Sequence, residues 1–145
     1  MITLLARRAL IGLLVFGAVS AVAGGVLGVA LNGAGVPLDY LQGTPFSSYV
    51  IPGLILGVAV GGTQSVAAIA VWRTAPWGMA AASVAGFGMI IWIFVELAIL
   101  TEYSFLQSIY FAVGLVELLL VLRMSGALGP FPQPGRRPRA TGGTR

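Results

Sequence analysis

Residues 49–73 read YVIPGLILGVAVGGTQSVAAIAVWR, and this stretch decides the class of fold. It contains no charged residue before Arg73, and a helix needs about 20 apolar residues to cross a hydrocarbon core about 30 Å thick. Gly53, Gly57 and Gly61 follow one another at four-residue steps, so they share one face of that helix. These two overlapping G-x-x-x-G motifs predict a transmembrane helix that packs closely against a neighbour.

Three further stretches of the chain have the same apolar character. With the first stretch they predict an all-α membrane protein, a four-transmembrane-helix bundle with short loops, formed by residues 1–124. Residues 125–145, which follow the predicted bundle, are rich in Gly, Pro and Arg, and this composition predicts a disordered cytoplasmic tail. The predicted spans cover approximately residues 9–31, 49–72, 77–100 and 104–122.

The composition supports a membrane protein and excludes several kinds of site. Hydrophobic residues make up 58% of the chain and charged residues 8%, which leaves too little polar surface to cover a soluble globule. The chain has no cysteine, so disulfides and thiolate metal sites are excluded, and no histidine, the commonest metal and haem ligand. We therefore expect no cofactor, no metal site and no catalytic residue.

All eight basic residues are arginines, and they can be placed on one side of a membrane. Their position at the inner ends of the spans follows the positive-inside rule and predicts a multi-pass protein of the cell (plasma) membrane with both termini in the cytoplasm. The formal charge of +4 is then explained by attraction to anionic inner-leaflet lipids, and nucleic acid is not expected as a partner. The basic residues are Arg7, Arg8, Arg73, Arg123, Arg136, Arg137, Arg139 and Arg145.

The first apolar stretch has a second interpretation. A basic start, an apolar core and the tripeptide Ala21-Val22-Ala23 resemble a cleaved signal peptide, which would leave three spans. Apolar residues continue to Leu31, so we favour an uncleaved first span. Within it, Gly24 and Gly28 form a stripe of small residues like that of the second span, and both stripes predict helix packing inside one bundle or against a second copy.

Five polar side chains inside the predicted spans are the candidate functional residues, because an ionisable group in a membrane is costly. Counting residues from the helix ends places Glu96 with Gln107 near the outer surface. The same count places Glu117 with Gln64 and Ser83 toward the inner surface. The candidates are Glu96, Gln107, Glu117, Gln64 and Tyr110.

These residues admit three interpretations. They can form interhelical hydrogen bonds that fix the packing, they can line a pathway for a proton or a small solute, or the two glutamates can act as acid and base of an enzyme. The predicted separation in depth of Glu96 and Glu117 is too large for both to act on one bond. We therefore expect a non-catalytic accessory or scaffold protein with a membrane-protein partner or a second copy, the alternative being a small-solute or proton transport component that uses the intramembrane glutamates.

One stretch resembles a known group of proteins. Residues 44–56, TPFSSYVIPGLIL, together with residues 92–96, WIFVE, are similar to small uncharacterised four-span membrane proteins of high-GC bacteria. The resemblance would cover approximately residues 44–120 and implies the four-span topology. It implies no activity.

Overall fold

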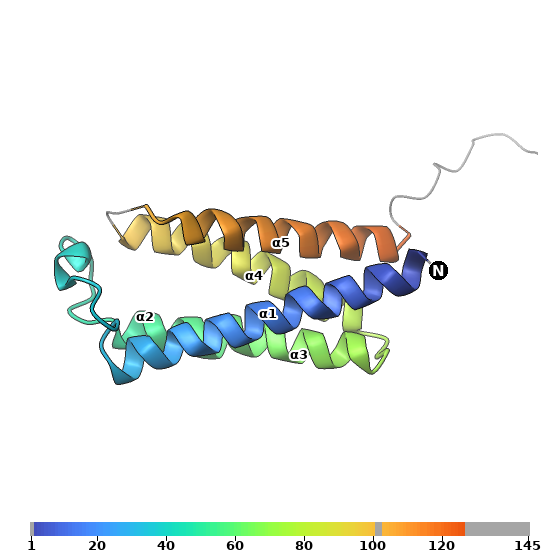
Figure 1. The fold of residues 1–145 in the computed structure, drawn as a ribbon, viewed down its shortest axis with the longest axis horizontal. Coiled ribbons are helices and arrows are strands. Elements are labelled where there is room, and N and C mark those ends of the chain that lie inside the picture. Colours follow the sequence, from blue (N-terminus) through green and yellow to red (C-terminus); the bar gives the residue numbers. More distant parts are fainter. Residues whose placement is uncertain (1, 101–102, 127–145) are drawn as a thin grey trace, which may run out of the picture.

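A computed structural model describes residues 2–100 and 103–126, and all regular structure in these two ranges is helical (Figure 1). Four helices are long and apolar enough to cross a membrane, which confirms the all-helical class and the number of candidate spans. Residues 127–145 of the predicted tail lie outside the described ranges. The elements are α1 (Ile2–Ala30), the 3₁₀ helix η1 (Leu38–Leu41), α2 (Val50–Leu54), the π-helix η2 (Ile55–Val60), α3 (Gly61–Trp72), α4 (Gly78–Ile99) and α5 (Phe105–Met124).

Two details differ from the predicted spans. Helix α1 begins at Ile2, so Arg7 and Arg8 belong to the helix instead of preceding it. The second span, Val50–Trp72, is one continuous helical rod, but its turns at Ile55–Val60 are π-helical. A π segment alters the rotation of the residues that follow it, and no apolar pattern in the sequence signals it.

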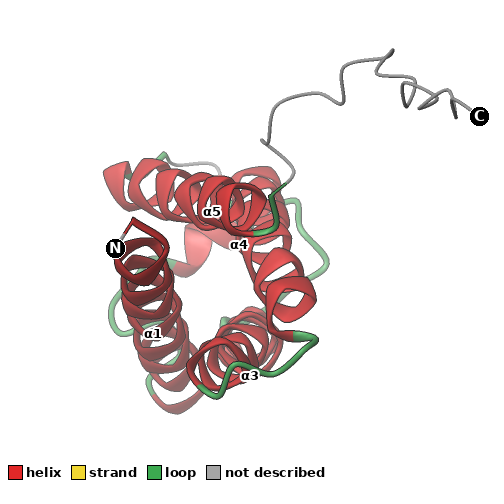
Figure 2. Cartoon of the chain, turned by 90° about the vertical axis from the view of Figure 1, so that its right-hand side faces the viewer, coloured by secondary structure: helices red, strands yellow, loops and turns green. Residues whose placement is uncertain are grey.

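The helices form a bundle in which α1, α3, α4 and α5 surround a common interior when viewed along the axis (Figure 2). The end that carries Arg7, Arg8, Arg73 and Arg123 is called the arginine end. The opposite end, where η1 and the connection from α4 to α5 lie, is called the loop end. Figure 1 shows that α1 lies near α5 at the arginine end and runs away from it toward the loop end, where α1 lies along α2.

Glycines explain why α1 follows α2 at the loop end. A Cβ atom added to Gly25 would lie 2.6 Å from the Cα of Gly57, and one added to Gly28 would lie 2.8 Å from the Cα of Gly53. Such backbone contact is open only to glycine. This glycine seam (Gly25, Gly28, Gly53 and Gly57) holds the two backbones together and leaves space between α1 and the pair α4 and α5.

The arginine end has a densely packed apolar interior. Leu10 and Leu14 of α1 are fully buried and pack against small residues of α3 and α4. The Arg7 side chain donates hydrogen bonds to the carbonyl oxygens of Val71 and Trp72, at 3.2 and 2.6 Å, and so ties α1 to the last turn of α3. The buried residues of this apolar cluster are Leu10, Leu14, Ala67, Ala68, Val71, Ala82, Ala85 and Val121.

The loop end is fastened to the bundle by Tyr49. Its backbone N–H donates to Oδ1 of Asn32 at 2.9 Å, and its hydroxyl donates to the carbonyl oxygen of Pro37 at 2.8 Å. Burial, and to a smaller extent the neighbouring Tyr40, raise the pKa of Tyr49 above its ordinary value, so the hydroxyl remains a donor at neutral pH. These bonds hold the segment between α1 and α2 over the interior of the bundle.

Candidate functional site

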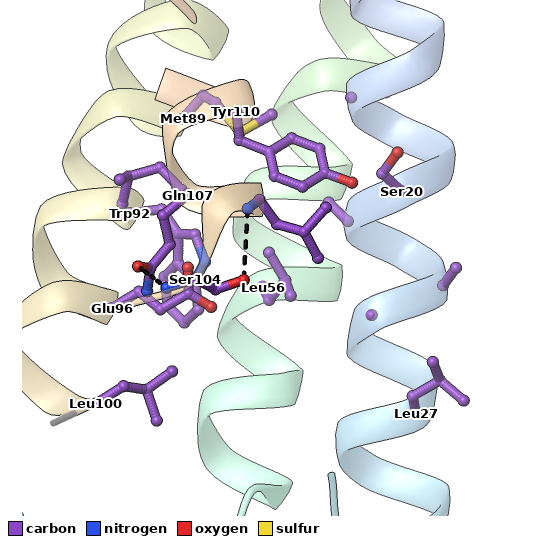
Figure 3. Close-up of a pocket in the computed structure, with 16 residues that line it drawn as sticks. Ser20, Leu27, Leu56, Met89, Trp92, Glu96, Leu100, Ser104, Gln107 and Tyr110 are labelled. Atoms are coloured by element: carbon purple, nitrogen blue, oxygen red, sulfur yellow. Dashed lines mark hydrogen bonds between the residues drawn. The ribbon is translucent and has the colours of Figure 1, made fainter. Parts of the chain in front are cut away.

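A cavity of about 450 Å³ lies between α1, η2, α4 and α5 in the half of the bundle nearer the loop end. Its walls are largely apolar, with Leu27, Leu56 and Leu100 from three different elements (Figure 3). An adjoining cavity of about 340 Å³ shares these three leucines and extends beneath Tyr49 and Leu41. We call the two adjoining cavities together the outer cavity, where "outer" means only that they lie toward the loop end. It lies where α1 diverges from α5 and approaches α2.

Glu96 is the one charged residue in the lining of the outer cavity. It lies on α4 close to the end of that helix at Ile99, and its side chain is half-buried. The Gln107 side chain of α5 lies beside it in the same wall (Figure 3). The structure thus brings together the pair that the depth count predicts near one surface.

The start of α5 fixes the orientation of Gln107. The backbone N–H of Ser104 donates to Oε1 of Gln107 at 3.0 Å, and the backbone N–H of Leu106 donates to Oγ of Ser104 at 3.4 Å. This is a capping box, in which side chains satisfy the free amides of the first helical turn. The capping box uses only the amide oxygen of Gln107, so its NH₂ group remains available to an acceptor in the cavity.

Two aromatic side chains complete this part of the wall. The ring of Tyr110 points into the outer cavity (Figure 3), and it stacks on Phe16 of α1 with ring centres 5.9 Å apart. Trp92 lies one helical turn before Glu96 and is almost completely buried. The cavity therefore presents a carboxyl group, an amide and two aromatic rings within apolar walls.

A second polar pair lies behind Gly17, a residue of the cavity wall. Gln64 of α3 and Glu117 of α5 are fully buried, and Nε2 of Gln64 donates to Oε2 of Glu117 at 3.0 Å. The Oε1 atom of each residue has no hydrogen-bond partner. A Cβ atom added to Gly17, which lines the cavity, would lie 3.0 Å from Oε1 of Gln64. Beyond this pair, toward the arginine end, lies the apolar cluster.

Not every predicted neighbour joins these pairs. Ser83 was placed by depth with Gln64 and Glu117, but its hydroxyl donates to the carbonyl oxygen of Met79 in its own helix, at 3.0 Å. Gly24 faces the Leu56 side chain, and Gly61 faces Val22, whereas Gly28, Gly53 and Gly57 form the seam. Sequence reasoning missed Gly25, which makes the closest approach in that seam.

The roles of Ser104 and Trp92 in the cavity were also not predicted. The spacing Ser104-x-x-Gln107 before an apolar run is a capping-box pattern, and it could have indicated that Gln107 is held by backbone contacts. No sequence signal could have identified Trp92 as cavity wall, because this depends on the space between α1 and α4.

The chemistry of the outer cavity suits binding. Within residues 2–100 and 103–126, no three acidic side chains lie close enough to form a metal site. Glu96 and Glu117 lie in different polar pairs, one in the cavity wall and one behind Gly17 of that wall. Comparison of the chain with protein-family models, with curated proteins and with solved structures finds no match.

Proposed function

We propose that this protein is a multi-pass protein of the cell membrane that binds a small molecule in the outer cavity without catalysing a reaction. The observation that carries this proposal is a cavity of about 450 Å³ with apolar walls and a few convergent polar groups, namely Glu96, Gln107 and Tyr110. Small-molecule sites in proteins have this size and this combination of walls and polar groups.

The arginines support an orientation for this site. All arginines of the described residues lie at the arginine end, and cytoplasmic segments of membrane proteins carry the excess of arginine and lysine. With the arginine end in the cytoplasm, the outer cavity faces the outer half of the membrane. A ligand would then enter from the outer side or from the outer leaflet.

Filling the outer cavity tests the proposal. Ser20 lines the cavity, whereas its neighbour Val19 is exposed on the lipid-facing side of α1. We expect a small molecule to be retained by the purified wild-type protein and by Val19→Phe, and to be lost in Ser20→Phe. The measurement is mass spectrometry of solvent extracts of the three purified proteins. Identical extracts that contain only bulk phospholipid would contradict the binding function.

A transport component is the second candidate, and the contact between the cavity and the second polar pair favours it. Gly17 lines the cavity and lies against Gln64, which binds Glu117, so polar groups continue from the outer cavity toward the middle of the bundle. The apolar cluster that contains Leu10 and Leu14 follows them. Transport would require this cluster to open.

An accessory role in a larger membrane assembly is compatible with ligand binding. A groove of about 400 Å³ runs along the bundle between the second span and α4, and its lining is mostly large apolar side chains, with the small residues Ala59, Thr63 and Gly88 among them. A helix of another membrane protein could approach closely there. Cross-linking in native membranes followed by mass spectrometry tests this role, because a stoichiometric partner linked through this groove is its expected result.

A further inference from the structure

We propose that the outer cavity selects a small organic cation with an apolar body, such as a tertiary amine or a quaternary ammonium ion, over neutral and anionic molecules. This inference rests on the proposed binding function and adds the chemical class of the ligand. It is argued from the charge in the cavity, from its aromatic side chains and from its volume.

The outer cavity has an acidic side chain in its lining and, among the described residues, no basic one. Glu96 is the one charged side chain in the lining, and Gln107 beside it is neutral. The arginines of the described residues lie at the arginine end, whereas Asp39 in η1 adds a further acid at the loop end. A carboxylate among apolar walls is costly without a positive partner, so a cationic ligand is stabilised there and an anionic one is repelled.

The aromatic side chains of the wall favour a cation of low charge density. Trp92 and Tyr110 both line the cavity, and Tyr49 lines its extension beneath the loop. The faces of such rings attract ammonium groups, and the attraction is larger in a site shielded from water. Proteins bind quaternary ammonium ions through aromatic rings in this way.

The remaining walls favour an organic ligand over a metal ion. Leucines at positions 27, 56, 100 and 106 surround the carboxyl group, and they offer an apolar body a surface to bury. Calcium needs six to eight oxygen ligands, and the lining provides one carboxylate with a few neutral oxygens. The volume of about 450 Å³ accommodates a molecule of several carbon atoms around one charged nitrogen.

Cysteine modification tests this selectivity, because the natural chain contains no cysteine. Ser20→Cys places a thiol in the cavity wall, and Ser47→Cys places one on the exposed connection at the loop end. Each variant is reacted with trimethylammonioethyl methanethiosulfonate, a cation, and with sulfonatoethyl methanethiosulfonate, an anion. The measured quantity is the cation-to-anion ratio of the reaction rates.

We expect this ratio to be at least about fivefold higher at Ser20→Cys than at Ser47→Cys, because the nearby carboxylate attracts one reagent and repels the other. Adding Glu96→Gln to Ser20→Cys should lower its cation-to-anion ratio to that of Ser47→Cys. Asp39→Asn is the matched control, since it removes an exposed acid of η1 that does not line the cavity, and it should leave the ratio at Ser20→Cys high. Tetrabutylammonium should slow labelling of Ser20→Cys only while Glu96 is present.

The outcomes separate this inference from the proposed function. Equal labelling of Ser20→Cys by both reagents, unchanged by Glu96→Gln, would show an accessible cavity without preference for cations and would overturn the inference alone. Ala21→Cys, at a buried position in the wall of the same cavity, is a second reporter in case Ser20→Cys fails to fold. If neither cavity cysteine reacts with either reagent while Ser47→Cys does, the cavity admits no solute, and both the inference and the binding function are wrong.

Discussion

The side chains of Gln64 and Glu117 are fully buried, so their polar atoms must find hydrogen-bond partners within the protein. Nε2 of Gln64 binds Oε2 of Glu117 and also lies 3.4 Å from the carbonyl oxygen of Ala85. Helices α3, α4 and α5 thus meet at one amide group. In an apolar bundle such a contact specifies which faces pack together, because a rotated helix would leave the polar atoms without partners.

We expect Gln64→Leu to lower the free energy of unfolding by about 1 to 3 kcal/mol, because it leaves the buried carboxyl of Glu117 without its donor. The double variant Gln64→Leu/Glu117→Leu should be more stable than Gln64→Leu alone, with a coupling energy of about 0.5 to 2 kcal/mol. Denaturation of the purified proteins in mixed detergent micelles measures these differences.

Ser83→Ala is the matched control for this pair. The Ser83 hydroxyl bonds within its own helix, so its removal should change the free energy of unfolding by less than about 0.5 kcal/mol. Strictly additive effects of the Gln64 and Glu117 substitutions would contradict the interpretation that these two side chains stabilise the bundle as a pair.

At the scale of the elements, the contact of α1 with α2 and η2 determines the shape of the interior. The glycine seam draws the loop-end half of α1 toward the second span, and the outer cavity lies on the side that α1 has left. In the other half of α1, Leu10 and Leu14 fill the interior completely. Helix α1 therefore fills the interior at the arginine end and borders a cavity toward the loop end.

Gly25→Ala and Gly12→Ala, two substitutions in α1, differ in their expected effect on the free energy of unfolding. A methyl group at Gly25 would lie 2.6 Å from the Cα of Gly57, and it must push α1 away from η2 at a cost of about 1 to 3 kcal/mol. Gly12 lies in the same helix with no atom within 4 Å of an added Cβ, so alanine there should be neutral or stabilise by up to about 1 kcal/mol. The same denaturation experiment measures both, and equal effects would show that α1 and η2 are not in backbone contact.

The helices could be predicted from the sequence, but the cavity could not. Uninterrupted apolar length indicated four spans, and the four-residue spacing of Gly53 and Gly57 indicated a close contact. The partner of that contact is set by the rotation of α1, which places Gly25 instead of Gly24 against Gly57. The stripe from Gly24 to Gly28 is consistent with either rotation, and the π turn at Ile55–Val60 shifts the register again. Helix rotation and tilt decide where space remains, and neither is encoded in hydropathy.

For the whole molecule, the distribution of charge predicts how the bundle lies in the membrane. Ser47 is exposed at the loop end, and Thr74 is exposed in the turn at the arginine end. We expect a membrane-impermeant maleimide added to intact cells to label Ser47→Cys, and to label Thr74→Cys only after the membrane is permeabilised. The cysteine-free wild type gives the background. Labelling of Thr74→Cys in intact cells would show the opposite orientation, with the outer cavity on the cytoplasmic side.

An interior that holds a cavity toward the loop end and is filled by apolar side chains at the arginine end predicts binding without proton conduction. The outer cavity ends at Gln64 and Glu117, and beyond them Leu10 and Leu14 leave no polar group to relay a proton toward the arginine end. Liposomes that contain the protein and a luminal pH dye should therefore acidify no faster than empty liposomes when a potassium gradient with valinomycin drives protons inward. A proton flux that disappears in Glu117→Gln would show that the apolar cluster opens, and it would favour the transport component over the binding protein. A flux that persists in both Glu96→Gln and Glu117→Gln would instead indicate a leak between the helices and the lipid, because no other acidic side chain of the described residues lies within a candidate span.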